Sequence, residues 1–214
     1  MLTQSLRALH EYAMERVKTI SLPTPAYDSG TSVEKSLRLR RSVREYRGGP
    51  LTLAQVAQLL WAAQGVTDPG GLRTAPSAGA LYPLEARVVS GNIDGLPAGI
   101  YHYRSLLHEL IRVIEGDKRG ELYRSSLGQP AVGDAALLLV FSGVYERTVS
   151  KYGQRGLRYV HMEAGHAAQN VCLQAVSLRL GVVMVGAFED SKVKKVLSLD
   201  ATEEPLYILA IGRI

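Results

Sequence analysis

Arginine side chains are concentrated in one short segment, where they could bind an anionic group. The segment reads Arg40-Arg41-Ser42-Val43-Arg44. Guanidinium groups hold phosphate through paired, charge-assisted hydrogen bonds, and a serine hydroxyl adds a neutral contact. In an extended segment alternate residues share a face, so Arg40, Ser42 and Arg44 would point toward one ligand. A flavin mononucleotide (FMN) would satisfy this pattern through its phosphate and its electron-rich reduced ring, whereas a solvated basic loop would need no ligand.

A second segment, Arg73–Glu85, contains two prolines, which restrict the backbone, and one glycine, which allows it unusual conformations. Pro76 and Pro83 restrict the backbone, and Gly79 would let the main chain approach a flat ligand closely. Tyr82 could stack on such a ligand or donate a hydrogen bond to it. A rigid turn that leads into a strand would explain the same residues without a ligand.

A third candidate, Val185-Gly186-Ala187-Phe188, follows a predicted buried strand. Backbone N–H groups at a glycine-containing strand end can reach a ring nitrogen or carbonyl without steric hindrance. An ordinary strand-to-helix connection is the alternative.

The histidines of a predicted long helix do not suggest a metal site. His161 and His166 are five positions apart, which is roughly 140° around a helix, so their side chains diverge. The single cysteine, Cys172, excludes an intrachain disulfide and a metal site made only of thiolates. Ala164, Ala168 and Cys172 recur every four residues and predict a smooth face for core or dimer packing. We therefore expect no bound metal.

Hydrophobic periodicity predicts an α+β protein with a mixed sheet. Helices are expected at 4–19, 53–65, 117–127, 157–180 and 190–197, and strands at 85–90, 99–103, 109–114, 135–141, 182–185 and 206–211. Thr52 is the expected N-cap of the second helix, and the strands at 99–103 and 109–114 are expected to pair as a hairpin.

Composition predicts one folded domain in a reducing compartment. The chain has 214 residues, of which 46% are hydrophobic and 21% charged, as in single domains with a continuous core. No stretch reaches the roughly 18 apolar residues of a membrane span, and the charged N-terminus does not resemble a signal peptide. We therefore expect a cytoplasmic protein without a membrane partner. The net charge of +5 is concentrated near position 40, which argues against a nucleic-acid partner.

Seven segments, in order, resemble the nitroreductase superfamily, and within it the streptolysin-type branch of dehydrogenases for thiazole and oxazole peptides. They are 40–44, Leu59–Gly65, Arg73–Glu85, Tyr152–Tyr159, Glu163–Asn170, Gly186–Phe188 and Leu206–Gly212. We accordingly expect one FMN-binding domain at 36–214, preceded by an unassigned helix and linker at 1–35.

The resemblance implies a nitroreductase-like fold, with a mostly antiparallel central sheet flanked by helices and a long central dimerisation helix. It also implies a homodimer that holds FMN between its subunits. The cofactor contacts would come from Arg40, Arg41, Ser42, Arg44 and Arg213, from Pro76, Ser77 and Ala78 of the other subunit, and from the backbone of Gly186 and Ala187. Lys151 and Tyr152, the only Lys-Tyr pair, would correspond to a catalytic pair of the branch.

Three functions follow from these residues. The first is an FMN-dependent oxidoreductase that passes hydride through flavin N5 from NAD(P)H to a nitroaromatic, quinone or similar acceptor. The second is an azoline dehydrogenase acting on a modified peptide, in which Lys151 and Tyr152 handle the proton. The third is a non-catalytic protein that uses its arginines to bind a phosphorylated ligand or nucleic acid.

Overall fold

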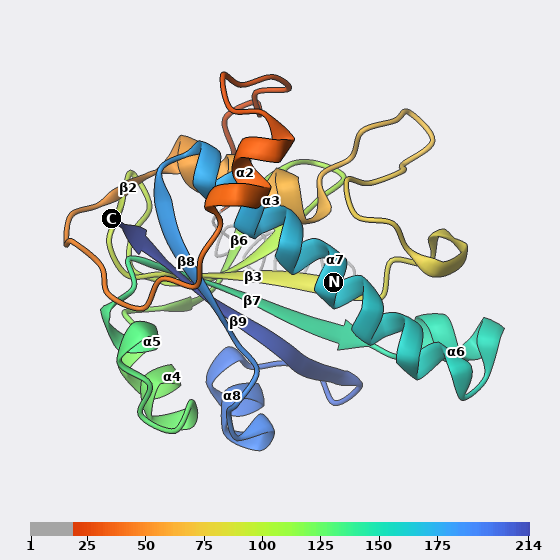
Figure 1. Cartoon of the computed structure of the whole chain (residues 1–214). Coiled ribbons are helices and arrows are strands. Elements are labelled where there is room, and N and C mark those ends of the chain that lie inside the picture. The colour runs from red at the N-terminus through yellow and green to blue at the C-terminus, as the bar shows by residue number, and fades with distance from the viewer. Residues whose placement is uncertain (1–18) are drawn as a thin grey trace, which may run out of the picture.

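The computed structural model describes residues 19–214, and its centre is a seven-stranded sheet (Figure 1). The strand order is β1-β6-β5-β3-β7-β9-β8, and each neighbouring pair is antiparallel. The strands are β1 (Thr19–Ser21), β3 (Leu84–Ser90), β5 (Gly99–Arg104), β6 (Glu109–Glu115), β7 (Leu137–Val144), β8 (Leu180–Val185) and β9 (Glu203–Arg213). A separate parallel pair, β2 (Leu51–Thr52) and β4 (Ile93–Asp94), makes the arrangement mixed. The predicted fold class and the 99–103/109–114 hairpin are confirmed.

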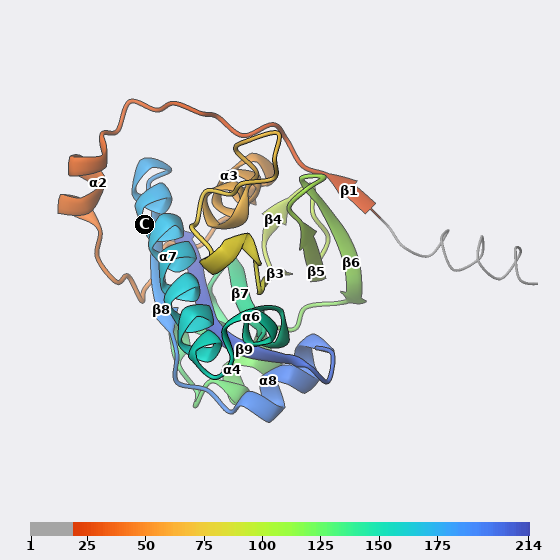
Figure 2. The same ribbon diagram turned by 90° about the vertical axis from the view of Figure 1, so that its right-hand side faces the viewer.

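Helices cover both faces of the sheet (Figures 1 and 2). One face packs against α3 (Leu53–Gln64) and α7 (Arg155–Ser177), and the other against α4 (Arg119–Ser125), α5 (Pro130–Asp134) and α8 (Asp190–Leu197). The short helices α2 (Val33–Leu39) and α6 (Glu146–Tyr152) lie at the margin, and a 3-10 turn, η1 (Ala78–Ala80), precedes β3. Within residues 19–214, no helix is both long and apolar enough to cross a bilayer.

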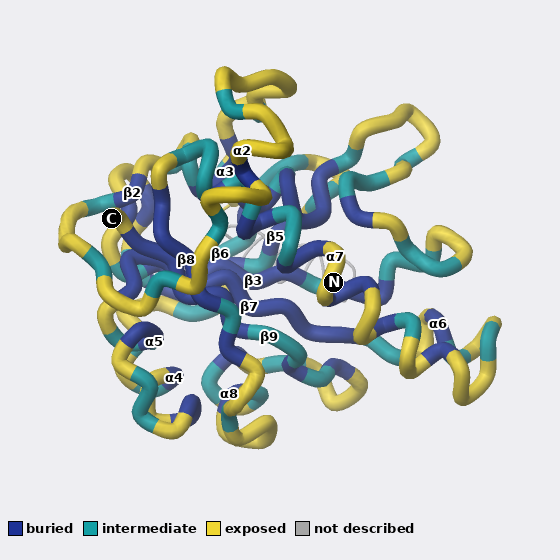
Figure 3. Tube along the Cα trace, in the orientation of Figure 1, coloured by how far each residue is buried: buried dark blue, intermediate teal, exposed yellow. Residues whose placement is uncertain are grey.

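Strand β7 shows why the centre of the sheet has an uninterrupted apolar sequence. Leu137, Leu139 and Phe141 pack toward α3 and α7. Leu138 and Val140 pack toward α4, α5 and α8. Successive side chains of a strand point to opposite faces, so a strand covered on both faces needs apolar residues at every position. Figure 3 shows this central strand buried along most of its length.

Helix α3 begins as its sequence predicts. The Thr52 hydroxyl accepts from Gln55 N, and the Gln55 side chain accepts from Thr52 N, which forms a capping box. Gly65 follows the last helical residue with an ordinary φ of −66°. A Cβ at position 65 would lie 2.1 Å from the Trp61 ring, so glycine is required here by close packing.

Helix α7 is shorter than predicted, because it ends at Ser177 and not at Leu180. Arg179 adopts a left-handed φ of +56°, which breaks the helix, and Leu180 already belongs to β8, opposite Arg213. Ala164, Ala168 and Cys172 are buried in the cluster that also contains α3. The predicted small-residue face therefore packs in the core of the chain.

The remaining differences involve short elements. Helices α2, α5 and α6 have seven, five and seven residues, too few for hydrophobic periodicity to be recognised. The helix predicted at 117–127 is limited to α4, and the strand predicted at 135–141 is shifted to β7. The helix predicted at 4–19 lies outside the described residues, except for Thr19, which belongs to β1.

Candidate active site

The predicted phosphate-binding residues lie together at one edge of the sheet. Ser42 forms a bridge to Val182 of edge strand β8, where Val43 N donates to Val182 O at 3.0 Å. Farther along, Arg47 N donates to Arg213 O at 2.9 Å. Backbone hydrogen bonds therefore hold the segment 40–47 along β8 and the end of β9.

Most cations of this edge have no acidic partner. Arg40 is half-buried, while Arg44 and Arg213 are exposed, and none of the three forms an ion pair with residues 19–214. Two guanidinium groups of this edge already donate to backbone carbonyls: Arg41 donates to Arg38 O (2.9 Å) and Arg40 O (2.7 Å) at the end of α2, and Arg213 Nε donates to Pro50 O (2.7 Å). Exposed, uncompensated guanidinium groups beside a serine hydroxyl suit a phosphate dianion.

The predicted catalytic pair meets the turn before β3. Gly79 has a left-handed φ of +64°, and a Cβ there would lie 2.9 Å from Lys151 Nζ and 2.8 Å from the Tyr152 hydroxyl. The structure thus brings Lys151 and Tyr152, which end α6, against the segment that contains Pro76, Ser77 and Ala78. This contact joins two of the motifs found in the sequence.

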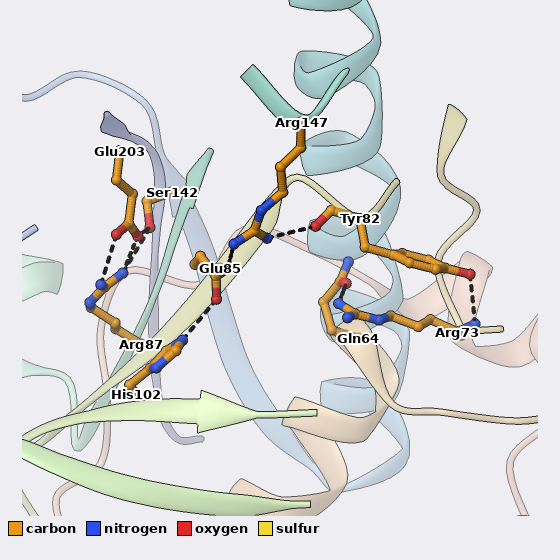
Figure 4. Close-up of polar contacts among 9 residues, drawn as sticks. All are labelled: Gln64, Arg73, Tyr82, Glu85, Arg87, His102, Ser142, Arg147 and Glu203. Atoms are coloured by element: carbon orange, nitrogen blue, oxygen red, sulfur yellow. Dashed lines mark hydrogen bonds and ion pairs between the residues drawn. The ribbon is translucent and has the colours of Figure 1, made fainter. Parts of the chain in front are cut away.

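A chain of ion pairs holds α6 in this position (Figure 4). Arg147, one helical turn before Lys151, donates to Tyr82 O at 3.0 Å and pairs with Glu85 Oε1 at 2.5 Å. The other carboxylate oxygen of Glu85 lies 2.8 Å from His102 Nε2. Burial alone would raise the pKa of Glu85, but the bonds to His102 and Arg147 hold it below its usual value. Glu85 is thus a charged anchor between β5 and α6.

The two groups of predicted residues lie apart within one chain. The segment 40–50 runs beside the C-terminal end of β9, whereas the turn before β3 lies beside α6 (Figure 1). Gly186 and Ala187 follow β8 and are exposed, and Ala187 O accepts from Gln129 Nε2 at 2.9 Å. A single chain therefore does not gather all the predicted residues around one cavity.

Residues 37–213 match the model of the nitroreductase family. The chain belongs to this family. It is 45% identical to "Putative nitroreductase MJ1384" of Methanocaldococcus jannaschii, over 85% of this chain and 90% of that protein. It is 34% identical to "Microcin B17-processing protein McbC" of Escherichia coli, over 77% of this chain and 63% of that one. A crystal structure of a "putative nitroreductase" from Ralstonia eutropha matches with a TM-score of 0.81 and 35% identity, over 91% of this chain and 89% of that one.

Family membership confirms the resemblance and the fold expected from the sequence, and it identifies the protein as a nitroreductase-family oxidoreductase. The similarity to a microcin-processing protein agrees with the streptolysin-type branch. Among residues 19–214, no cluster of three or more histidine, cysteine, aspartate or glutamate side chains is arranged to bind a metal. Burial raises the pKa of the Cys172 thiol to about 11, against the opposing charge of Arg40.

This nitroreductase-family chain also contains a buried acid that the sequence analysis did not select. Glu163 of α7 is 2% exposed. Its Oε1 has no hydrogen-bond partner among the described residues. Burial raises its pKa to about 7, although Ser77 and Arg73 act to lower it. Glu163 is therefore a buried acid with a raised pKa, next to the turn that meets Lys151 and Tyr152. In the sequence, the position of Glu163 at the start of the motif Glu163–Asn170 was the signal that could have identified it as a candidate site residue.

Proposed function

We propose that the protein is an FMN-dependent oxidoreductase, active as a homodimer in the cytoplasm, with residues 36–214 forming one FMN-binding domain. Its reaction is hydride transfer from NAD(P)H, through flavin N5, to a nitroaromatic, quinone or similar acceptor. Membership in the nitroreductase family supports this assignment. The single observation that carries the cofactor assignment is the group of guanidinium side chains at the edge of β8 and β9 that form no ion pair with residues 19–214.

The residues at that edge fit FMN by charge and by donor type. Arg40, Arg44 and Arg213 would hold the phosphate and the pyrimidine edge, with Ser42 as a neutral donor and Arg41 nearby. Cations at this position also stabilise negative charge on a reduced ring, because guanidinium groups remain protonated. Bound FMN would supply two-electron redox chemistry, and the protein would supply binding, orientation and electrostatics.

A homodimer would bring the separated groups together. Met162 of α7 leaves 49% of its surface exposed, and it lies on the side of the helix opposite the buried residues. Pairing through this side would place Pro76, Ser77 and Ala78 of one subunit over a cofactor held by the arginines of the other. The exposed backbone of Gly186 and Ala187 would present its N–H groups to the flavin ring.

Purification tests this proposal directly. We expect a yellow protein whose released cofactor co-elutes with FMN and which oxidises NADH or NADPH in the presence of menadione or nitrofurazone. Size-exclusion chromatography with light scattering should give the mass of two chains. A colourless protein that takes up no added FMN would contradict the proposal.

A second candidate is an azoline dehydrogenase for modified peptides. The contact of Lys151 and Tyr152 with Gly79 favours it, as does the relative named for microcin processing. A thiazoline or oxazoline ring would lose hydride to the flavin and a proton to Lys151 or Tyr152, giving the aromatic azole, and an electron acceptor would reoxidise the flavin. Lys151→Met separates the two functions: loss of azoline oxidation with retained FMN and quinone reduction supports this candidate, and unchanged azoline oxidation opposes it.

A further inference from the structure

A cavity of about 400 Å³ lies between the end of α3, the first residues of β3 and the β5–β6 hairpin. Its walls include Gln64, Arg73, Glu85, His102, Tyr103 and the hairpin residues up to Leu107. This volume is within the usual range of small-molecule sites. None of the predicted cofactor-binding or catalytic residues lines it.

The polar groups of this cavity include two hydrogen-bond donors without acceptors. Gln64 is only 2% exposed, and its Nε2 has no partner among the described residues. The Nε of Arg73 is also buried and unpartnered within that part of the chain. Buried donors that lack an acceptor are costly, so both atoms favour a ligand that brings acceptor oxygens.

The charge of Arg73 is not neutralised by a direct ion pair. Its guanidinium donates to Gln64 Oε1 at 2.8 Å and lies 4.3 Å from the centre of the Tyr82 ring, and no carboxylate within residues 19–214 forms a salt bridge with it. Burial lowers its pKa, against the raising effect of Glu85.

The one carboxylate of the cavity wall is already occupied. Both oxygens of Glu85 are engaged, one by Arg147 and the other by His102. Figure 4 shows Gln64 and Arg73 together, with Glu85 turned toward His102 and Arg147. At the hairpin, Arg104 is paired with Glu109 at 3.1 Å. Among the charged groups that residues 19–214 contribute to the cavity wall, Arg73 is therefore the one without an ion pair, and Glu163 of α7 acts on it less than Glu85 does.

Most of the rest of the wall is apolar, apart from Ser105. Leu84, Ala86 and Tyr103 are buried beside the cavity, and Leu106 and Leu107 at the hairpin turn are 72% and 58% exposed. Large exposed leucines beside a concave site provide surface that a ligand with an apolar body would cover.

We propose that this cavity is a ligand site separate from the cofactor residues, and that it binds a small organic carboxylate with an apolar body through Arg73 and Gln64. The carboxylate would accept from the Arg73 guanidinium and the Gln64 amide once these side chains turn their buried, unpartnered donors toward the cavity, and the apolar body would lie against Leu84, Leu106 and Leu107. The site needs no redox chemistry, so it does not depend on the function proposed above.

Calorimetric titration of the purified protein, saturated with added FMN, tests the site. The probes are benzoate, 3-phenylpropionate and octanoate, each compared with its neutral amide. At least one acid should bind saturably, and its amide at least about tenfold more weakly, because a charge-assisted pair is lost. Absence of saturable binding for all three acids, or equal binding of acid and amide, would overturn the proposal.

Variants locate the binding. Arg73→Gln should weaken binding of the acid about tenfold or more, with the far-ultraviolet circular dichroism unchanged. The double variant Leu106→Ala and Leu107→Ala changes only exposed side chains and should weaken it several-fold, which keeps the test valid if Arg73→Gln does not fold. Arg112→Gln is the matched control, because Arg112 is a half-buried arginine of the same hairpin that does not line the cavity. Loss of binding in Arg44→Gln, or full retention in the double leucine variant, would place the acid elsewhere and refute the site.

Discussion

The carboxylate of Glu203 on β9 is paired with the guanidinium of Arg87 on β3, across the intervening strand β7. Arg87 Nη2 donates to Glu203 Oε2 at 2.9 Å, and a second bond joins Nη1 to Oε1. Ser142 of β7 contributes to the same network, accepting from Arg87 Nη1 at 3.1 Å and donating to Glu203. Arg87 and Glu203 are 7% and 2% exposed. The pair thus links three adjacent strands inside the fold.

Removing one partner of this buried pair should destabilise the protein strongly. Glu203→Gln leaves the Arg87 cation uncompensated, and we expect it to lower the free energy of unfolding by about 3–5 kcal/mol. Chemical denaturation measures the effect. Lys192→Gln breaks a surface pair with Glu189, in which the two side chains are 59% and 44% exposed, and it should cost less than about 1 kcal/mol. Equal effects of the two variants would contradict the structural role of the buried pair.

Gly79→Ala should impair turnover more than stability. The left-handed backbone costs a non-glycine residue about 1–2 kcal/mol, and the new Cβ would displace Lys151 Nζ and the Tyr152 hydroxyl. If this pair acts on the substrate, kcat should fall about tenfold to a hundredfold.

Gly71→Ala is the matched control for the Gly79 variant, because Gly71 has a φ of +86° and open space around its Cβ position. It should show a similar loss of stability with unchanged kcat. If both variants turn over normally, the contact between Gly79 and the Lys151–Tyr152 pair has no catalytic role.

Arg40→Gln and Arg44→Gln should each weaken FMN binding by about tenfold to a hundredfold, because a hydrogen bond to a charged group contributes about 1.5–3 kcal/mol. The dissociation constant can be measured by flavin fluorescence quenching, and it should rise with ionic strength. Arg124→Gln, an exposed substitution on α4, should leave it unchanged. Normal FMN affinity in the double variant Arg40→Gln/Arg44→Gln would rule out this edge as the phosphate site.

Glu163 should make stability decrease as the pH rises. Its pKa is 4.5 in the unfolded reference and about 7 in the folded protein, so between these values the folded state binds more protons. The contribution of Glu163 to stability is then highest below about pH 4.5, falls toward pH 7 and stays constant above it, with a total change of up to about 3 kcal/mol. Denaturation at several pH values should show this slope in the wild type and its loss in Glu163→Gln. Glu115→Gln, an exposed control, should retain the slope.

The sequence was sufficient to predict those helices and strands that are specified by residues close together in the chain. Thr52 and Gln55 indicate where α3 begins, because the two residues of a capping box are only three positions apart in the chain. The alternation of β5 and β6 predicts their hairpin, because the partner strand follows after one turn. The ordered motifs also indicated the family, since each motif is contiguous.

Only some residues of the candidate site could be predicted from the sequence. Arg40, Arg44 and Lys151 stood out as charged residues in recognisable motifs. Arg147 and His102 did not, because their importance comes from sharing Glu85, and this carboxylate is brought to them by strands and helices distant in sequence. The same is true of Gln64 and Arg73, whose unpartnered donors exist only because the surrounding side chains exclude water.

The amino-acid sequence alone determined the fold class, the central helix and strands, and the family. These follow from periodicity and contiguous motifs, which local backbone chemistry controls. The tertiary structure alone decided that Lys151 and Tyr152 contact Gly79, that Ala164 and Cys172 face the core, and that Glu163 is buried with a raised pKa. Burial and long-range contacts set these properties, because desolvation and ion pairing depend on which distant residues surround a group.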